Sequence, residues 1–285
     1  MQRALVHAGY RVSRATIRRL LHALGIRPKT NVKRLAPRQH PDRDRQFRYI
    51  RAQRRRFVAS EWPVLSVDCK KKELIGPFKN PGRVWSRTAP AVYATDFPGD
   101  AICKATPYGI YDVGANTGHV YVGTLGESAD LAVAALVHWW QHVGRRRYPT
   151  ARQVLILADG GGSNGARRQR WKQQLQVRLA DPLGLTITVC HYPPGASKWN
   201  PIEHRLFSQI SETWAGTPLT SLQVLLDGIR RTTTATGLRV TATLFTRRFP
   251  KGVKVTKREM ASLAITKHVT CPQWNYTIKP RLIGK

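Results

Sequence analysis

The feature that most constrains the fold is a regular alternation of short apolar segments and helical segments. The segments "PVLSVD", "YGIYDVG", "HVYVGTL", "QVLILAD" and "LTITVCHY" have the length and the residue types of strands. "ANTG" joins the second to the third and predicts a hairpin. Helical patterns at 128–143, at 165–180 and from Asn200 make the later strands parallel, in an α/β domain whose mixed sheet is flanked by helices. We expect this core at 61–215 and a helical or irregular extension at 216–285.

The charge is strongly positive and unevenly distributed. The chain has 48 Lys and Arg against 16 Asp and Glu, a formal net charge of +32. Residues 1–60 hold 17 of these cations and only Asp42 and Asp44 as acids. Because phosphate groups reward clustered cations through counterion release, nucleic acid is the expected partner, ahead of an anionic membrane.

Neither a membrane span nor a secretory signal is recognisable. The longest apolar run, "LAVAALVHWW", is too short to cross a bilayer, and the chain starts with a basic segment. We therefore expect a cytoplasmic, nucleoid-associated protein. The four cysteines are far apart and include no C-x-x-C pair, so we interpret them as reduced thiols.

Residues 1–27 have the pattern of the last two helices of a helix-turn-helix. Ser13 is placed to cap the second helix, on which Arg14, Arg18 and Arg19 are free to meet DNA. The alternative is a basic amphipathic helix that only packs on the core. We expect this DNA-binding segment to be truncated at its N-terminus, because its second-last helix begins almost at Met1.

A linker and a basic helix are predicted at 28–60. The linker is rich in Pro and polar residues, and "RDRQFRYIRAQRRRF" at 43–57 places aromatic residues among its arginines. One side of this helix is expected to pack on the core, and the other, with Arg54 and Arg55, to meet phosphate.

Two aspartates stand at the ends of predicted strands. Asp68 ends "VLSV" and Asp159 ends "VLILA". Functional groups gather beyond the carboxyl ends of strands in open α/β sheets, although each residue alone could be a turn aspartate. Like charges brought together are costly unless a cation lies between them, so the pair predicts a cation site.

The glycine cluster "GGGSNG" after Asp159 has the spacing of a phosphate-binding loop. Ala166 and Arg167 stand where such a loop needs Lys and Ser or Thr, so no nucleotide cofactor is expected. Ser163 and Asn164 are interpreted as caps of the following helix.

Glu203 has two interpretations. With Asn200 as N-cap and Pro201 after it, Glu203 fits the third helical position of a capping box. It is also in line with an apolar stripe formed by Leu206, Phe207, Ile210 and Trp214. An acid on the buried side needs a partner, and a metal ion held jointly with Asp68 and Asp159 would provide one.

Oxygen ligands of this kind suit Mg²⁺, or Mn²⁺ in its place, and do not suit zinc. Two such ions between carboxylates can activate an attacking oxygen and stabilise the leaving oxygen of a phosphodiester. The predicted chemistry is therefore phosphodiester cleavage or transfer.

The chain resembles the DDE transposases of bacterial insertion sequences, specifically the ISAzo-thirteen family. The motifs that carry the resemblance are "SVDCKKKELIGPFKN", "PYGIYDVGANTGHVYVGT", "LILADGGGSNGAR", "HYPPGASKWNPIEHRLFSQIS" and "WNYTIKP", which span roughly residues 40 to 280. The resemblance implies a ribonuclease H-like core in which Asp68, Asp159 and Glu203 are the metal-binding triad. It also implies nicking at the element's ends, attack of the freed 3′-hydroxyl on target DNA, and a homo-oligomer on double-stranded DNA that carries the terminal repeats.

Two other functions stay open: a catalytically inactive, truncated transposase that only binds DNA selectively, and a structure-specific nuclease. Next to Glu203, Lys198 is a candidate phosphate contact, and Trp199 either stacks on an unpaired base or anchors the core. His191 and His204 are interpreted as structural residues. The alternative is that either contacts a phosphate or positions a water molecule. Asp112 is expected to serve the hairpin and not the metal site.

Overall fold

The computed structural model describes residues 1–29 and 40–281. The chain divides into two units, one within residues 1–38 and one within residues 39–285. The predicted linker lies mostly outside the described residues. Each unit is described by itself.

The N-terminal unit contains two short helices, α1 (Gln2–His7) and α2 (Arg14–Ala23). Ser13 caps α2, because its side chain accepts a hydrogen bond from the Thr16 amide at 3.0 Å. Gly25, at a φ of 72°, follows the end of the helix. The two predicted helices and the predicted cap are therefore confirmed.

The larger unit is built on one mixed sheet of nine strands. In chain order the strands are β1 (Val64–Cys69), β2 (Glu73–Ile75), β3 (Cys103–Asp112), β4 (Thr117–Gly123), β5 (Gln153–Ala158), β6 (Thr186–His191), β7 (Arg239–Phe245), β8 (Ile265–Lys267) and β9 (Asn275–Ile278). Eight of them lie in the order β7-β4-β3-β1-β5-β6-β9-β8, and β2 pairs with β3.

Strands β4, β3 and β1 are antiparallel neighbours, and β5 and β6 continue parallel to β1. This arrangement of three antiparallel and two parallel strands is a ribonuclease H-like sheet, which confirms the predicted fold class. The hairpin and the parallel strands are where the sequence predicts them.

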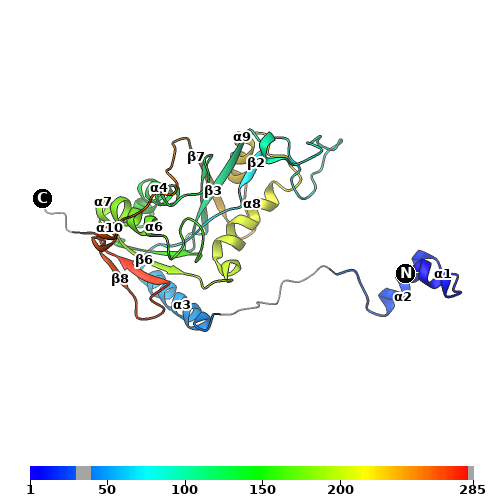
Figure 1. The fold of residues 1–285 in the computed structure, drawn as a ribbon, viewed down its shortest axis with the longest axis horizontal. Coiled ribbons are helices and arrows are strands. Elements are labelled where there is room, and N and C mark those ends of the chain that lie inside the picture. The colour runs from blue at the N-terminus through cyan, green and yellow to red at the C-terminus, as the bar shows by residue number, and fades with distance from the viewer. Residues whose placement is uncertain (30–39, 282–285) are drawn as a thin grey trace. The chain divides into compact units, whose positions relative to one another are not determined.

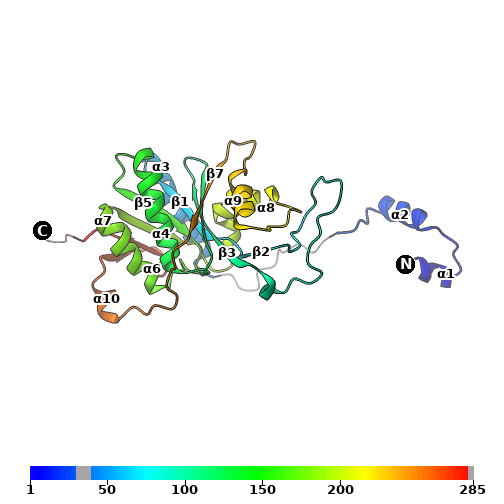
Figure 2. The same cartoon turned by 90° about the horizontal axis from the view of Figure 1, so that it is seen from above.

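Helices cover both faces of the sheet (Figures 1 and 2). They are α3 (Arg43–Ala59), α4 (Ala129–Trp139), α5 (Arg145–Arg147), α6 (Gln169–Gln174), α7 (Asp181–Leu183), α8 (Ser208–Thr213), α9 (Leu222–Arg230) and α10 (Lys257–Ala261). Three π-helical turns, η2 (Trp140–Gly144), η3 (Leu175–Ala180) and η5 (Glu203–Phe207), interrupt the longer helices. Two 3₁₀ turns, η1 (Pro98–Asp100) and η4 (Ser197–Trp199), lie in loops.

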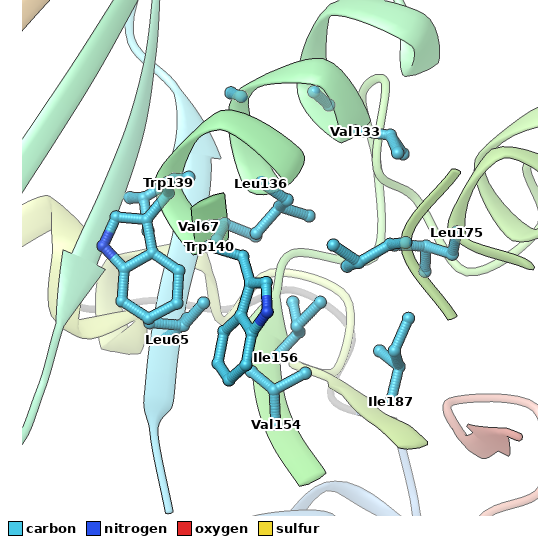
Figure 3. Packing of buried hydrophobic residues seen from close by; sticks show 14 of the residues in the cluster. Leu65, Val67, Val133, Leu136, Trp139, Trp140, Val154, Ile156, Leu175 and Ile187 are labelled. Atoms are coloured by element: carbon cyan, nitrogen blue, oxygen red, sulfur yellow. The ribbon is translucent and has the colours of Figure 1, made fainter. Parts of the chain in front are cut away.

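The core is divided by the sheet into layers. On one face, α4 and η3 pack on alternate residues of β1, β5 and β6, such as Leu65, Val67, Ile156 and Ile187 (Figure 3). On the other face, α3 packs on Leu155 and its neighbours, and helices η5, α8 and α9 pack on β3, β4 and β7. This two-sided burial explains why the central strands are almost continuously apolar.

The extension at 216–285 contributes β7, β8 and β9 to the two ends of the sheet, which the sequence did not predict. β8 and β9 have only three and four residues, too few for an alternation signal, whereas β7 does alternate polar and apolar residues and sequence reasoning missed it. The four cysteines are free, as predicted. Within the described ranges, no helix is both long and apolar enough to span a bilayer.

Candidate active site

The two strand-end aspartates face the same side of the sheet. Leu65 and Val67 pack on the α4 side, so the alternation of side chains along β1 directs Asp68 to the opposite side. In β5, Ala158 packs on the α4 side, and Asp159 follows it. Because β1 and β5 are parallel and Val67 is paired with Ala158, Asp68 and Asp159 are side by side at one edge of the sheet.

Glu203 is brought to this edge by a close helix-to-sheet contact. Gly109 of β3 is paired with Asp68, and a Cβ at this glycine would lie 2.6 Å from Cε1 of Phe207. Gly118 of β4 leaves similar room for another side chain of the same helix. Two glycines on the sheet therefore let the helix that carries Glu203 approach to a distance that alanines would prevent.

The helix itself is irregular at this point. Residues 201–213 are helical, and Glu203 is the first residue of the π-helical turn η5. Single π turns inside helices are frequent at functional sites, because they redirect side chains relative to a regular α-helix.

Asn200 precedes this helix but does not cap it with its side chain. Its Nδ2 donates to Oδ1 of Asp159 at 3.1 Å and to the carbonyl of Val67 at 3.3 Å, and its Oδ1 accepts from the Ser66 hydroxyl. The free amide of Ile202 donates to the oxygen of Ser66 at 2.9 Å. The predicted capping box is therefore wrong: a serine of β1 caps the helix, which frees the asparagine to hold the aspartate.

The three carboxyl groups influence one another. Burial and the charge of Asp159, with smaller contributions from Glu203 and Glu127, raise the pKa of Asp68 to about 8 against a hydrogen bond from the Cys69 amide. Burial raises the pKa of Asp159 to about 6 against the hydrogen bond from Asn200. Burial also raises the pKa of Glu203, whereas His204 and a hydrogen bond from the Asp68 carboxyl lower it. Asp159 and Glu203 therefore both disfavour the ionised form of Asp68.

This set of groups fits a divalent cation. In residues 1–29 and 40–281, no three His, Cys, Asp or Glu side chains are already gathered as a ready-made metal site. Asp159 and Glu203 nevertheless raise the pKa of Asp68, and Glu203 raises that of Asp159, so the three carboxyls are within electrostatic reach and a cation between them would offset their charges. Oδ1 of Asn164, buried near the same strand ends, has no hydrogen-bond partner among the described residues. Its amide donates to the carbonyl of Val67 at 3.4 Å. The carboxylates and the Asn164 side chain would bind a cation through oxygen atoms, which suits Mg²⁺ or Mn²⁺.

Ser163 and Asn164 do not cap the helix that follows, which corrects the prediction. Helix α6 begins at Gln169, and no side chain caps it. The amide of Ser163 instead donates to Oε1 of Glu127, which comes from the loop before α4. Glu127 thus fixes the glycine-rich loop next to Asp159. Sequence reasoning missed it because it lies outside any strand end or motif.

A second missed group is Lys70, two residues beyond Asp68. Its Nζ lies 2.6 Å from Glu73 and 4.9 Å from the ring centre of Trp214. Its charge also lowers the pKa of Glu203. Lys70 is therefore a largely buried cation beside the carboxyl cluster.

The remaining candidate residues, His191, His204 and Asp112, have different surroundings. His191 is fully buried, bonds the Asp159 carbonyl through Nδ1 at 2.9 Å, and has its pKa lowered to about 4 by burial, so it supports the site as a neutral group. His204 is exposed. Asp112 is at the other end of β3, paired with Leu65, and accepts hydrogen bonds from two turn amides and from Tyr148, which matches its expected hairpin role.

A basic and aromatic groove of about 570 Å³ lies between α3 and the loop before the Glu203 helix. Trp199 is 51% exposed and meets Phe47 edge-on at 6.1 Å, so it is not a core anchor. Lys198 lies over the Trp199 ring at 5.6 Å. Arg54 lines this groove, and both Arg54 and Arg55 line a neighbouring one along α3.

In the N-terminal unit, Arg14, Arg18 and Arg19 are exposed on α2. Nε of Arg14 donates to Gln2 at 3.0 Å, which ties α2 to α1. The placement leaves all three side chains open to solvent.

Comparison with known proteins gives a family match over nearly the whole chain. The family model described as "Rhodopirellula transposase DDE domain" matches residues 1–280. No curated protein is significantly similar in sequence. Among solved structures, the Mos1 transposase paired-end complex with the left transposon end has a TM-score of 0.44 and 18% identity, covering 76% of this chain and 67% of that chain. The Mos1 strand transfer complex has a TM-score of 0.45 and 18% identity, covering 75% and 60%. The Mos1 paired-end complex with Mg has a TM-score of 0.41 and 19% identity, covering 74% and 60%.

Proposed function

Because the chain belongs to the family of Rhodopirellula transposase DDE domains, we propose that it nicks and joins DNA at the ends of an insertion sequence. The observation that carries this proposal is that Asp68 and Asp159 lie side by side at one end of the sheet with Glu203 close enough to raise the pKa of both.

In this proposal Asp68, Asp159 and Glu203 hold the metal. Two Mg²⁺ or Mn²⁺ ions held by these carboxylates would supply Lewis acidity for displacement at phosphorus. The chain's own groups prepare the site. Asn200 orients Asp159, and the glycines under the helix set the position of Glu203. Lys70 offsets part of the negative charge.

Two chemical steps follow from this assignment. Water attacks a phosphodiester at the element's end, which leaves a 3′-hydroxyl on one fragment and a 5′-phosphate on the other. The 3′-hydroxyl then attacks a phosphodiester of target DNA, forms a new bond, and releases a target 3′-hydroxyl. Both steps are in-line displacements at phosphorus, so one carboxylate site serves both.

DNA is proposed to contact three parts of the chain. Arg14, Arg18 and Arg19 of α2 are assigned to the duplex, in the manner of a recognition helix. Phosphate contacts are assigned to Arg54 and Arg55 of α3 and to Lys198, and stacking on a base is assigned to Trp199. The family resemblance also supports a multimer of this chain on paired DNA ends, which the mass of the protein–DNA complex in light scattering would test.

The experiment is a nicking and joining assay with Mg²⁺ on a duplex that carries the terminal repeats flanking the gene. Wild type is compared with Asp159→Asn and with Asp227→Asn, which changes a half-exposed aspartate on α9 that pairs with Arg230. We expect nicked and joined products from wild type and Asp227→Asn and none from Asp159→Asn. Equal activity in all three would refute the assignment. Released ends without joined products would identify a nuclease.

A further inference from the structure

A second basic cavity lies beside the carboxyl cluster, away from the groove at α3. Its volume is about 630 Å³. Four separate segments line it: the loop after β1 at Lys72, the start of α4, the glycine-rich loop leading to α6, and residues 250–255. None of the DNA contacts proposed above belongs to it.

The cavity is adjacent to the proposed metal ligands. Lys72 is four residues beyond Asp68, and Gly162 of the lining is three residues beyond Asp159. Glu127 both lines the cavity and raises the pKa of Asp68. A linear polymer that leaves the carboxyl cluster on this side therefore enters the cavity directly.

The cations of the lining outnumber its acids. It contains six Lys or Arg side chains and two acids. Asp130 is paired with Arg170 at 2.6 Å, and Glu127 accepts the Ser163 amide. Five cationic side chains of the lining have no carboxylate within salt-bridge distance among the described residues: Lys72, Arg167, Arg168, Lys251 and Lys254. Such a cluster repels itself unless an anion lies between its members.

The outer wall is held in place by the core. After β7 at one end of the sheet, the chain runs back to α10 and then β8 at the other end. Phe249 anchors this crossing segment in the main core, and a capping box between Thr256 and Glu259 fixes its far end. Nζ of Lys251 lies so close to Gly126 that a Cβ there would be 2.5 Å from it. Lys251 and Lys254 are thus carried by a segment fixed on both sides.

The chemistry of the lining indicates which part of a nucleic acid it takes. It includes no Phe, Tyr or Trp, unlike the groove that contains Trp199. Flexible ammonium and guanidinium groups without a stacking surface suit phosphates and not bases. We propose that this cavity binds the phosphodiester backbone of the DNA strand that continues from the carboxyl cluster. The proposal rests on the proposed function, since it presumes that DNA occupies that cluster.

The first test uses lysine labelling of the whole chain with an amine-reactive reagent, read by mass spectrometry. A duplex carrying a terminal repeat is added at saturating concentration in chelator. We expect DNA to protect Lys251 and Lys254 several-fold, and Lys257, which is exposed on α10 outside the lining, to stay reactive. Equal labelling of Lys251 and Lys254 with and without DNA would overturn the proposal.

The second test compares the salt dependence of DNA binding. Each lost phosphate contact reduces the slope of log K against log salt by about 0.9. Lys251→Ala with Lys254→Ala is therefore expected to reduce the slope by about 1.8, and the matched pair Lys257→Ala with Lys267→Ala to leave it unchanged. Equal slopes for the two double variants would contradict the proposal.

The proposed function and the proposed DNA-binding role of the cavity can be refuted independently of each other. Asp159→Asn is expected to lose nicking and to retain protection of the two lysines. Protected lysines in a wild-type chain that cannot nick DNA would refute the proposed function and uphold the cavity. Nicking by a chain whose lysines stay unprotected would uphold the function and refute the cavity.

Discussion

Nδ2 of Asn200 donates a hydrogen bond to Oδ1 of Asp159 over 3.1 Å, and this contact joins the Glu203 helix to β5. The same amide side chain reaches β1 through Ser66 and Val67. One buried residue therefore connects the three elements that carry the proposed metal ligands. Its hydrogen bond also favours the ionised form of Asp159, because it lowers the pKa that burial raises.

Replacing Asn200 by alanine is expected to impair activity through Asp159. Without the hydrogen bond the pKa of Asp159 rises, so the acidic limb of the pH–activity profile moves to higher pH. The buried Ser66 hydroxyl also loses its acceptor, at a cost of about 1–3 kcal/mol in unfolding free energy. Nicking rates across pH, with denaturant unfolding of the same protein, measure both effects.

Asn80→Ala is the matched control. The Asn80 side chain also donates two partly buried hydrogen bonds, but to the carbonyls of Trp214 and Thr217 and not to Asp68, Asp159 or Glu203. It is expected to lower stability without moving the pH profile. A profile that moves equally in both variants would show that Asn200 acts only through stability.

Metal binding is expected to tighten as pH rises from about 6 to about 8. The pKa of Asp159 is about 6 and that of Asp68 is about 8, and both carboxyls must lose their protons to bind a cation. Affinity for Mg²⁺ then rises up to about tenfold per pH unit for each proton released. Calorimetric titration in buffers of different ionisation enthalpy counts these protons. Affinity that does not change with pH would contradict the coupling.

Asp68→Asn is expected to stabilise the fold at alkaline pH when a chelator is present. The folded chain binds more protons than the unfolded chain between the ordinary pKa of 3.8 and about 8, so wild-type stability falls as pH rises through this window. The variant lacks that loss, so its melting temperature should be a few degrees higher above pH 8 and equal below about pH 4. Thermal melts at both ends test this, and added Mg²⁺ should favour wild type alone.

Gly109→Ala is expected to displace the Glu203 helix. Its Cβ would lie 2.6 Å from Phe207, which forces the helix or the strand to move. Overpacking of this kind costs about 1–3 kcal/mol, and misplacement of Glu203 could reduce nicking by up to about a hundredfold. Gly99→Ala is the control, because nothing lies within 4 Å of its Cβ position. Full activity in Gly109→Ala would show that the close contact does not set the site.

The main strands, and the positions of Asp68 and Asp159 at the ends of two of them, could be predicted because their signals are local. Apolar runs followed by Asp68 and Asp159 determine strands and strand ends, and alternation determines which side each residue faces. The contacts around them could not be predicted in the same way. Ser66 and Asn200 are 134 residues apart in sequence, and Ser163 and Glu127 are 36 apart.

The capping prediction failed for a related physical reason. The residues at 200–203 suit a capping box by local propensity, but the amide of Ile202 is satisfied by Ser66 from another strand. Once that bond is made, the Asn200 side chain can serve Asp159. Likewise, β8 is only three residues long and is held by its pairing with β9, so its own sequence is too short to predict it.

Trp199→Ala is expected to weaken binding of single-stranded DNA by about 1–3 kcal/mol, the contribution of one base stacked on an aromatic ring. The ring is half exposed at a groove lined by arginines, where Phe47 meets it edge-on and Lys198 lies over it. Trp85→Ala is the matched control, because Trp85 is fully exposed and does not line the groove that contains Trp199. Fluorescence anisotropy with a labelled oligonucleotide compares them, and Trp199→Phe should recover most of the affinity. If both alanine variants bind as wild type does, Trp199 has no role in stacking and the groove contributes only charge.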